Sequence, residues 1–298
     1  MLVRHLNFGT YRPPSRRLVN GEGSYFQAAH MLCHCLLVET EGGLVLVDTG
    51  FGTRDIADPV GRLGRAFLLR SRPVLRPEET AVQQLRELGY DPRDVRHIVL
   101  THLDRDHTGG LADFPDARVH VYGPEYRAAM NPPSKLERGR YRQSQWAHGP
   151  NWEIHELTEG ERWFGFESVR ELPGLPPEIL LIPLPGHTRG HVGVAVETGD
   201  RPLLHAGDAY MFHGEIADQP WCTPGLNAFQ RKVETVPDRL PNVARLRELR
   251  RGGGADVFSA HDTTEYRARA QGMAQGTAQG TAQGTAQDGL REGRTRNG

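Results

Sequence analysis

Five short apolar segments of the chain are each followed closely by an aspartate or a histidine. The residue types in these segments favour β-strands. Side chains that follow the carboxyl ends of strands usually meet at one edge of a layered α/β fold. The pattern therefore predicts a single site, because five coincidences of this kind are harder to obtain by accident than one motif. The segments are 44–47, 97–101, 179–184, 202–205 and 256–259, and the side chains are Asp48, His102, His187, Asp208 and His261.

The rest of the sequence indicates alternating strands and helices. Residues 31–38 and 44–48 flank a Glu-Gly-Gly turn signal, which predicts a β-hairpin. Further strands are predicted at 118–122 and 192–197. Apolar residues at helical spacing predict helices over 76–89, 225–235 and 240–251, and another helix begins within 125–130. The stretch 131–177 has no regular pattern.

The segment Thr101–Gly110 reads THLDRDHTGG and contains four candidate metal ligands within six positions. They are His102, Asp104, Asp106 and His107. Imidazole and carboxylate ligands together suit Zn²⁺ or a similar divalent ion. A single histidine here would indicate only a polar loop, whereas the whole cluster favours metal binding.

The order and spacing of the motifs resemble the metallo-β-lactamase-fold hydrolase superfamily, in particular its lactonase and thioesterase-like branch. The resemblance covers about residues 1–266. It implies an α/β fold of the four-layer αββα sandwich type, with the site on one edge and a small molecule as the substrate. The matching segments are 47–50, 101–110, 185–191 (PGHTRGH), 206–208 (AGD) and 260–262 (AHD).

The resemblance also implies a binuclear metal site, with two Zn²⁺ ions expected and Mn²⁺ or Fe²⁺ as alternatives. Asp208 would bridge the two ions, and Asp48 and His191 would orient ligands from behind. One ion would be bound by His102, Asp104 and His187, and the other by Asp106, His107 and His261.

Asp104 departs from the family pattern His-x-His-x-Asp-His, which has a histidine at this position. An aspartate reaches less far from the backbone and adds a negative charge. A carboxylate is a harder ligand than an imidazole, so Asp104 favours Mn²⁺ or Fe²⁺ more than a histidine would. The first ion would therefore sit closer, accept a bridging water or be held more weakly, and if it is held more weakly, Asp104→His should tighten the site.

The implied reaction is attack of a shared hydroxide on an ester, lactone or thioester, with Asp106 handling a proton. Tyr210 and His213 are further catalytic candidates, because they follow Asp208 by two and five residues. In lactone-cleaving members a tyrosine shortly after this aspartate assists the substrate carbonyl, but the offset here differs, so this role stays open. Two segments, 131–177 and Pro220-Trp221, either form walls of the substrate pocket or are ordinary surface loops.

Other function classes are less well supported. A di-iron redox protein of the same fold would carry an attached flavodoxin-like domain, for which the chain has no length. A degenerate, non-catalytic member would not need so complete a ligand set. The net charge of −1 gives no sign of a nucleic-acid surface. With no apolar signal peptide or membrane span, the chain is expected to be cytoplasmic, without a membrane partner. Its oligomeric state is not predicted.

The remaining features are interpreted as structural. Cys33 and Cys35 are expected to pack in the core, and His34 between them points to the opposite face of its strand. Residues 1–270 are predicted to form one hydrolase domain. Residues 271–298 contain an Ala-Gln-Gly-Thr repeat without hydrophobic periodicity and are predicted to be a disordered tail.

Overall fold

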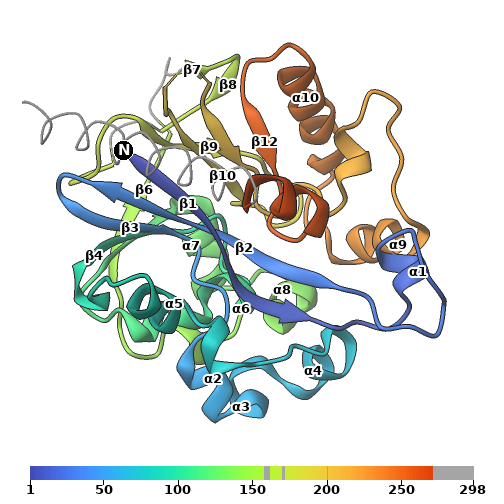
Figure 1. The fold of residues 1–298 in the computed structure, drawn as a ribbon, viewed down its shortest axis with the longest axis horizontal. Helices are drawn as coiled ribbons and strands as arrows, with labels where there is room; N and C mark the ends of the chain where they lie inside the picture. Colours follow the sequence, from blue (N-terminus) through green and yellow to red (C-terminus); the bar gives the residue numbers. More distant parts are fainter. Residues whose placement is uncertain (158–161, 170–171, 200, 271–298) are drawn as a thin grey trace, which may run out of the picture.

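The computed structural model describes residues 1–157, 162–169, 172–199 and 201–270. Two β-sheets lie face to face, with helices on the outer side of each (Figure 1). The first sheet has the order β1-β2-β3-β4-β5-β6 and the second the order β12-β11-β10-β9. The predicted αββα sandwich is therefore confirmed. The predicted disorder of residues 271–298 concerns residues outside the described ones.

The strands of the first sheet are β1 (Leu2–Tyr11), β2 (Met31–Thr40), β3 (Gly43–Val47), β4 (Val95–Val99), β5 (Arg118–Tyr122) and β6 (Asn151–His155). Those of the second are β9 (Ile179–Pro183), β10 (Val192–Val196), β11 (Leu203–His205) and β12 (Asp256–Phe258), and β7 (Arg162–Trp163) pairs with β8 (Phe166–Glu167). The pairs β3–β4 and β11–β12 are parallel. Their carboxyl ends therefore lie together, which places the residues that follow them side by side.

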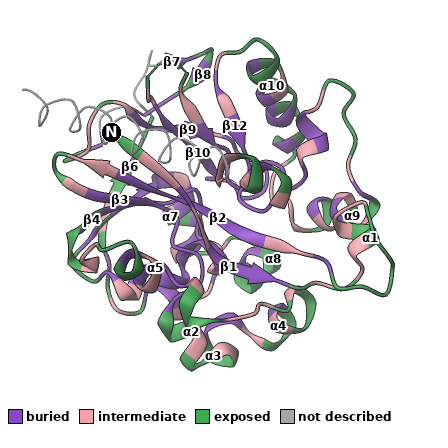
Figure 2. Cartoon of the chain, in the orientation of Figure 1, coloured by how far each residue is buried: buried purple, intermediate pink, exposed green. Residues whose placement is uncertain are grey.

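The helices are α1 (Arg16–Val19), α2 (Thr53–Ala57), α3 (Pro59–Leu63), α4 (Arg65–Ser71), α5 (Ala81–Glu87), α6 (Arg105–Thr108), α7 (Gly123–Met130), α8 (Lys135–Arg140), α9 (Pro224–Val233) and α10 (Arg239–Arg251). Within the described ranges no helix is long and apolar enough to cross a membrane. Figure 2 shows that buried residues are concentrated in the strands, while the outer helices are exposed on one side.

The four layers are held together by three apolar clusters. One cluster lies between the first sheet and its helices, where Leu85 of α5 packs with Ile98 of β4. The second fills the space between the two sheets and contains Val47 and Val194. The third joins the second sheet to α10, where Leu246 is buried. Since burial of apolar area is the main favourable term in folding, the cluster between the sheets holds them face to face, and the other two hold the outer helices against the sheets.

The elements differ from the predicted ones in several places. The single helix expected over 76–89 is a short 3₁₀ turn, Pro77–Glu79, followed by α5, because extended backbone at Thr80 separates them. The first strand, β1, is absent from the predictions, since its polar and apolar residues do not alternate cleanly. The 131–177 stretch contains α8, a 3₁₀ turn and three short strands. The hairpin of β2 and β3 is as predicted.

Histidines form two hydrogen-bonded groups inside the first sheet. His97 Nδ1 lies 2.9 Å from His120 Nε2, and His120 Nδ1 lies 2.9 Å from His155 Nε2, so one imidazole from each of β4, β5 and β6 joins a continuous row. A second pair joins His5 Nδ1 to His34 Nε2 at 2.8 Å. Burial lowers the pKa values of His120 and His5 to about 3, with neighbouring cationic groups adding to the effect. These rings are therefore neutral at pH 7.

Candidate metal centre

The loops that follow β3, β4, β9, β11 and β12 meet at one edge of the sandwich, as the sequence predicts. His102 and Asp104 follow β4, and Asp106 and His107 begin the short helix α6. His187 lies in the loop after β9, Asp208 follows β11 and His261 follows β12. The structure brings together all seven of the predicted metal ligands.

The first donor group consists of His102, Asp104 and His187. Asp104 Oδ2 lies 3.1 Å from His187 Nε2 and 3.5 Å from His102 Nε2. The carboxylate reaches the two imidazoles, although its Oδ2 also lies 3.1 Å from the guanidinium of Arg140.

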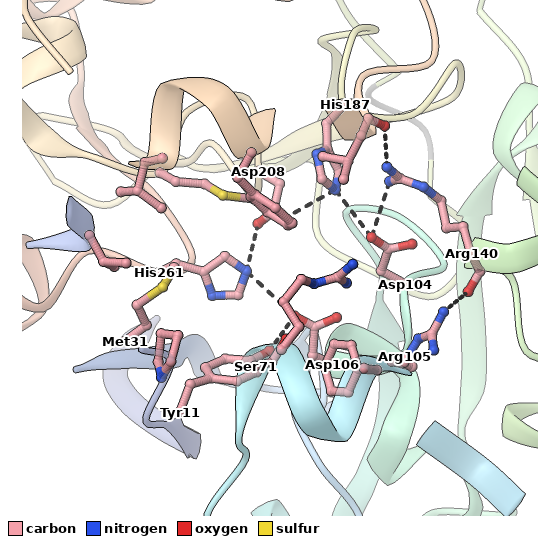
Figure 3. A pocket seen from close by; sticks show the side chains of 18 of the residues that line it. Tyr11, Met31, Ser71, Asp104, Arg105, Asp106, Arg140, His187, Asp208 and His261 are labelled. Atoms are coloured by element: carbon pink, nitrogen blue, oxygen red, sulfur yellow. Dashed lines mark hydrogen bonds and ion pairs between the residues drawn. The ribbon is translucent and has the colours of Figure 1, made fainter. Parts of the chain in front are cut away.

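The second donor group consists of Asp106, His107 and His261. Asp106 Oδ2 lies 3.5 Å from His261 Nε2 and 3.9 Å from His107 Nε2. Asp208 lies between the two groups. Its Oδ1 is 3.1 Å from His261 Nε2 and its Oδ2 is 3.3 Å from His187 Nε2, as Figure 3 shows. One carboxylate thus faces both groups, which is the placement expected of a bridging ligand.

The donor set fits two divalent ions. The Nε2 atoms of His102 and His107, Oδ1 of Asp104 and Oδ1 of Asp208 are buried and have no hydrogen-bond partner among the described residues. Buried polar atoms without a partner are costly in a folded protein. Imidazole nitrogens and carboxylate oxygens that converge in this way are the ligands that zinc and similar ions take.

Asp48 is hydrogen-bonded to His107 of the second donor group and to the neighbouring Thr101. Its Oδ1 accepts a hydrogen bond from Thr101 N at 2.8 Å, and its Oδ2 lies 2.7 Å from His107 Nδ1. Burial raises the pKa of Asp48, but the adjacent His107 outweighs this and brings the value to about 2. The backbone of Asp48 has a φ of 58°, a strained conformation for a residue other than glycine, and such strain is concentrated at functional sites.

Hydrogen bonds on the far side of the rings fix three further histidines. His261 Nδ1 lies 2.8 Å from the carbonyl oxygen of Leu32, and His102 Nδ1 lies 3.0 Å from Thr101 Oγ1. His191 is not part of a donor group. Its Nε2 accepts a hydrogen bond of 2.9 Å from the backbone N–H of Asp208. Contacts of this kind set the tautomer and direction of metal-binding rings. They agree with the supporting role expected for Asp48 and His191.

A cavity of about 610 Å³ opens above the donor groups. Asp104, Asp106, His187, Asp208 and His261 form its floor. Its walls come from α4, α8, α9 and the segment that connects β1 to β2, and most of the wall side chains are apolar, including Leu18, Val19, Phe67, Leu136, Leu226 and Phe229.

Comparisons with known proteins agree with this geometry. The model of the metallo-beta-lactamase superfamily matches residues 30–276. A probable metallo-hydrolase of Mycobacterium tuberculosis is 45% identical over 268 residues, covering 89% of this chain and 81% of the relative. The chain belongs to the metallo-β-lactamase superfamily. An N-acyl homoserine lactonase of Bacillus thuringiensis is 32% identical over 237 residues, covering 78% of this chain and 82% of that protein.

Two solved structures support the metallo-β-lactamase fold. One is an N-acyl homoserine lactone hydrolase with N-hexanoyl-L-homoserine bound at its metal centre. Its TM-score is 0.65 at 22% identity, with 89% of this chain and 95% of that one covered. The other is a dizinc quorum-quenching lactonase with a TM-score of 0.58 at 17% identity, covering 87% and 86% of the two chains.

Two of the three catalytic candidates lie away from the donor groups of this metallo-β-lactamase site. Tyr210 is fully buried, and its hydroxyl lies 3.0 Å from Glu265 Oε1. It is not among the described residues that line the cavity. His213 lies 2.8 Å from Asp262 Oδ2 and lines a neighbouring, more polar pocket that shares His261. Asp106, the third candidate, is at the cavity floor.

Tyr11 and Arg140 are polar residues of the cavity that the sequence motifs do not indicate. The hydroxyl of Tyr11, at the end of β1, donates a hydrogen bond to Asp106 Oδ2. Arg140, at the end of α8, lies against Asp104. Tyr11 precedes the residues that the family model matches, and Arg140 stands among many other arginines. Of the 131–177 stretch, only α8 contributes described residues to the cavity, and Trp221 lines the neighbouring pocket.

Proposed function

We propose that the chain is a metal-dependent hydrolase that cleaves an ester, lactone or thioester bond of a small molecule. One observation carries this proposal: two donor groups share Asp208 at the floor of a cavity with apolar walls. When bound, two divalent ions supply Lewis acidity and lower the pKa of a water molecule. His102, Asp104 and His187 would hold one ion, and Asp106, His107 and His261 the other.

The residues of the chain have separate tasks in this proposal. Asp208 faces both donor groups and fixes the separation between them. Asp106 is proposed to handle a proton of the reaction, and the Tyr11 hydroxyl donates a hydrogen bond to its Oδ2. Tyr11 lines the cavity, and its proposed role is to contact a substrate oxygen next to Asp106.

The substrate proposed is a small ester or lactone with an apolar acyl group. The apolar walls from α4, α8 and α9 would exclude water from that group. Relatives named as N-acyl homoserine lactonases support this class, since their substrates combine an acyl chain with a lactone ring. Zn²⁺ is the ion proposed, with Mn²⁺ or Fe²⁺ as the alternatives that Asp104 favours.

The test is hydrolysis by metal-analysed protein. Acyl homoserine lactones of several chain lengths, a simple lactone, a thioester and a phosphodiester would be compared. We expect cleavage of at least one of the first three classes, loss of activity with a chelator and recovery when a divalent ion is added. Full activity in a rigorously metal-free sample would contradict the proposal, as would cleavage of the phosphodiester alone.

Replacing Tyr11 by phenylalanine is expected to lower kcat about 10- to 100-fold while metal content stays the same. The change removes one hydroxyl that contacts Asp106. A general acid or base contributes about 100- to 10,000-fold, and a hydroxyl that only assists such a group should contribute no more than the lower end of that range. The matched control is Tyr210→Phe, which removes a hydroxyl bonded to Glu265 and should leave kcat unchanged. If Tyr210→Phe proved the more damaging of the two, the assignment of the tyrosines would be wrong.

A further inference from the structure

Asp104 is paired with a buried cation. Arg140 Nη1 lies 3.1 Å from Asp104 Oδ2, and the two side chains are only 6% and 17% exposed. This is the same carboxylate that replaces the family's second histidine. Figure 3 shows the guanidinium reaching toward Asp104 from the side opposite Asp106. A hydrogen bond between two ionised groups in a poorly solvated place is strong, so this contact constrains the carboxylate.

Arg140 is held firmly by the surrounding elements. Its Nη2 donates to the carbonyl oxygen of Val233 at the end of α9. Its own carbonyl oxygen accepts a hydrogen bond of 2.6 Å from Arg105 Nη2, and Arg105 immediately follows Asp104. One turn earlier in α8, Glu137 is bonded at 2.7 Å to Arg189, in the loop that carries His187. The position of α8, and with it Arg140, is therefore tied to both loops of the first donor group.

The pair also changes the charge of the site. With a histidine at position 104, the ligands would carry two negative charges, from Asp106 and Asp208. Asp104 adds a third. A guanidinium stays protonated in proteins, so Arg140 cancels the added charge and returns the total to that of the usual set.

We infer that Asp104 and Arg140 form one unit that replaces the family's neutral histidine, and that Arg140 is a positioning residue of the first metal site. It sets the direction of the Asp104 carboxylate and restores the charge of the ligand set. This inference rests on the proposed function, because it assigns a role within the same two-metal site.

The effect of Asp104→His then depends on Arg140. On its own, this change leaves a buried guanidinium without its carboxylate, next to the position of a divalent cation. Repulsion between the two cations should weaken metal binding about 10-fold or more, within the range found when supporting residues of metal sites are changed. This result is the opposite of the tighter first site expected from the sequence alone. Removing the charge of Arg140 as well should recover the loss.

The experiment is a mutant cycle measured as zinc affinity, by competition with a chromophoric chelator, alongside metal analysis. The proteins are wild type, Asp104→His, Arg140→Gln and both double variants, Asp104→His with Arg140→Gln or with Arg140→Lys. We expect weak binding in Asp104→His and in the double variant with lysine, and recovery in the double variant with glutamine. Arg251→Gln, an exposed arginine paired with Glu248, is the control, and thermal unfolding checks that each variant folds.

The inference would be overturned if the effects of the two substitutions were additive within about twofold, or if lysine and glutamine gave equal recovery. Wild-type protein that bound no divalent ion would also overturn it. The readout does not depend on a substrate. Protein with the expected coupling that hydrolysed none of the tested compounds would support the inference and contradict the proposed function.

Discussion

Replacing Asp208 by asparagine is expected to lower kcat/KM at least about a thousandfold and to reduce the metal content from two ions to one or none. The loss corresponds to about 4 kcal/mol of transition-state stabilisation. Asp208 is the only described carboxylate within 4 Å of imidazoles of both donor groups. An amide keeps the shape of the side chain but removes its charge and one of its two oxygens. Both donor groups should therefore lose metal affinity together.

The measurement is metal analysis and kinetics after reloading each protein with the same ion. Asp116→Asn, at an exposed position before β5, is the matched control and should retain both ions and full activity. Asp48→Asn is an intermediate case, because Asp48 orients His107 and Thr101. Such changes typically lower metal affinity 10- to 100-fold. If the Asp208 variant retained two ions at unchanged affinity, Asp208 would not be the bridging ligand.

The free energy of unfolding is expected to fall by about 2 kcal/mol between pH 7.5 and pH 5 because of His120 alone. Burial is the main cause that lowers the pKa of His120 to about 3, and His155, His97 and Arg118 lower it further. An unfolded histidine takes up a proton near pH 6.5, whereas the folded one does not until about pH 3. Stability is therefore full above pH 6.5 and is lost progressively as the pH falls below that value.

His120→Gln tests this prediction. Glutamine can donate and accept a hydrogen bond in the row but does not titrate, so the variant should be less stable at pH 7.5 and lose less stability on acidification. Urea unfolding at several pH values gives the difference in stability between the variant and wild type. The contributions of the candidate metal-ligand histidines largely cancel in this difference. His148→Gln, at a half-buried position outside the row, should change the pH dependence less. A slope identical to that of wild type would exclude protonation of His120 as a cause of acid instability.

The convergence of the seven candidate ligands could be predicted because each follows a strand, and parallel neighbours such as β3 and β4 bring the ends of strands to one edge. The roles of Tyr11 and Arg140 could not. Tyr11 reaches the site because β1 pairs along β2, and nothing in its own sequence indicates that pairing. Arg140 depends on where α8 ends relative to the loop of Asp104, and this is set by contacts of high sequence separation, such as Glu137 with Arg189. Tyr210 is a catalytic candidate by sequence because it follows Asp208 closely, but its hydroxyl is bonded to Glu265 and not directed into the cavity.

The two donor groups draw on both halves of the chain. His102, Asp104, Asp106 and His107 follow a strand of the first sheet, while His187, Asp208 and His261 follow strands of the second. Each donor group contains at least one residue from either half, so a bound ion would act as a cross-link across the seam between the sheets. A substitution in the apolar layer between the sheets, such as at Val194, would therefore change the metal affinity, although Val194 does not line the cavity.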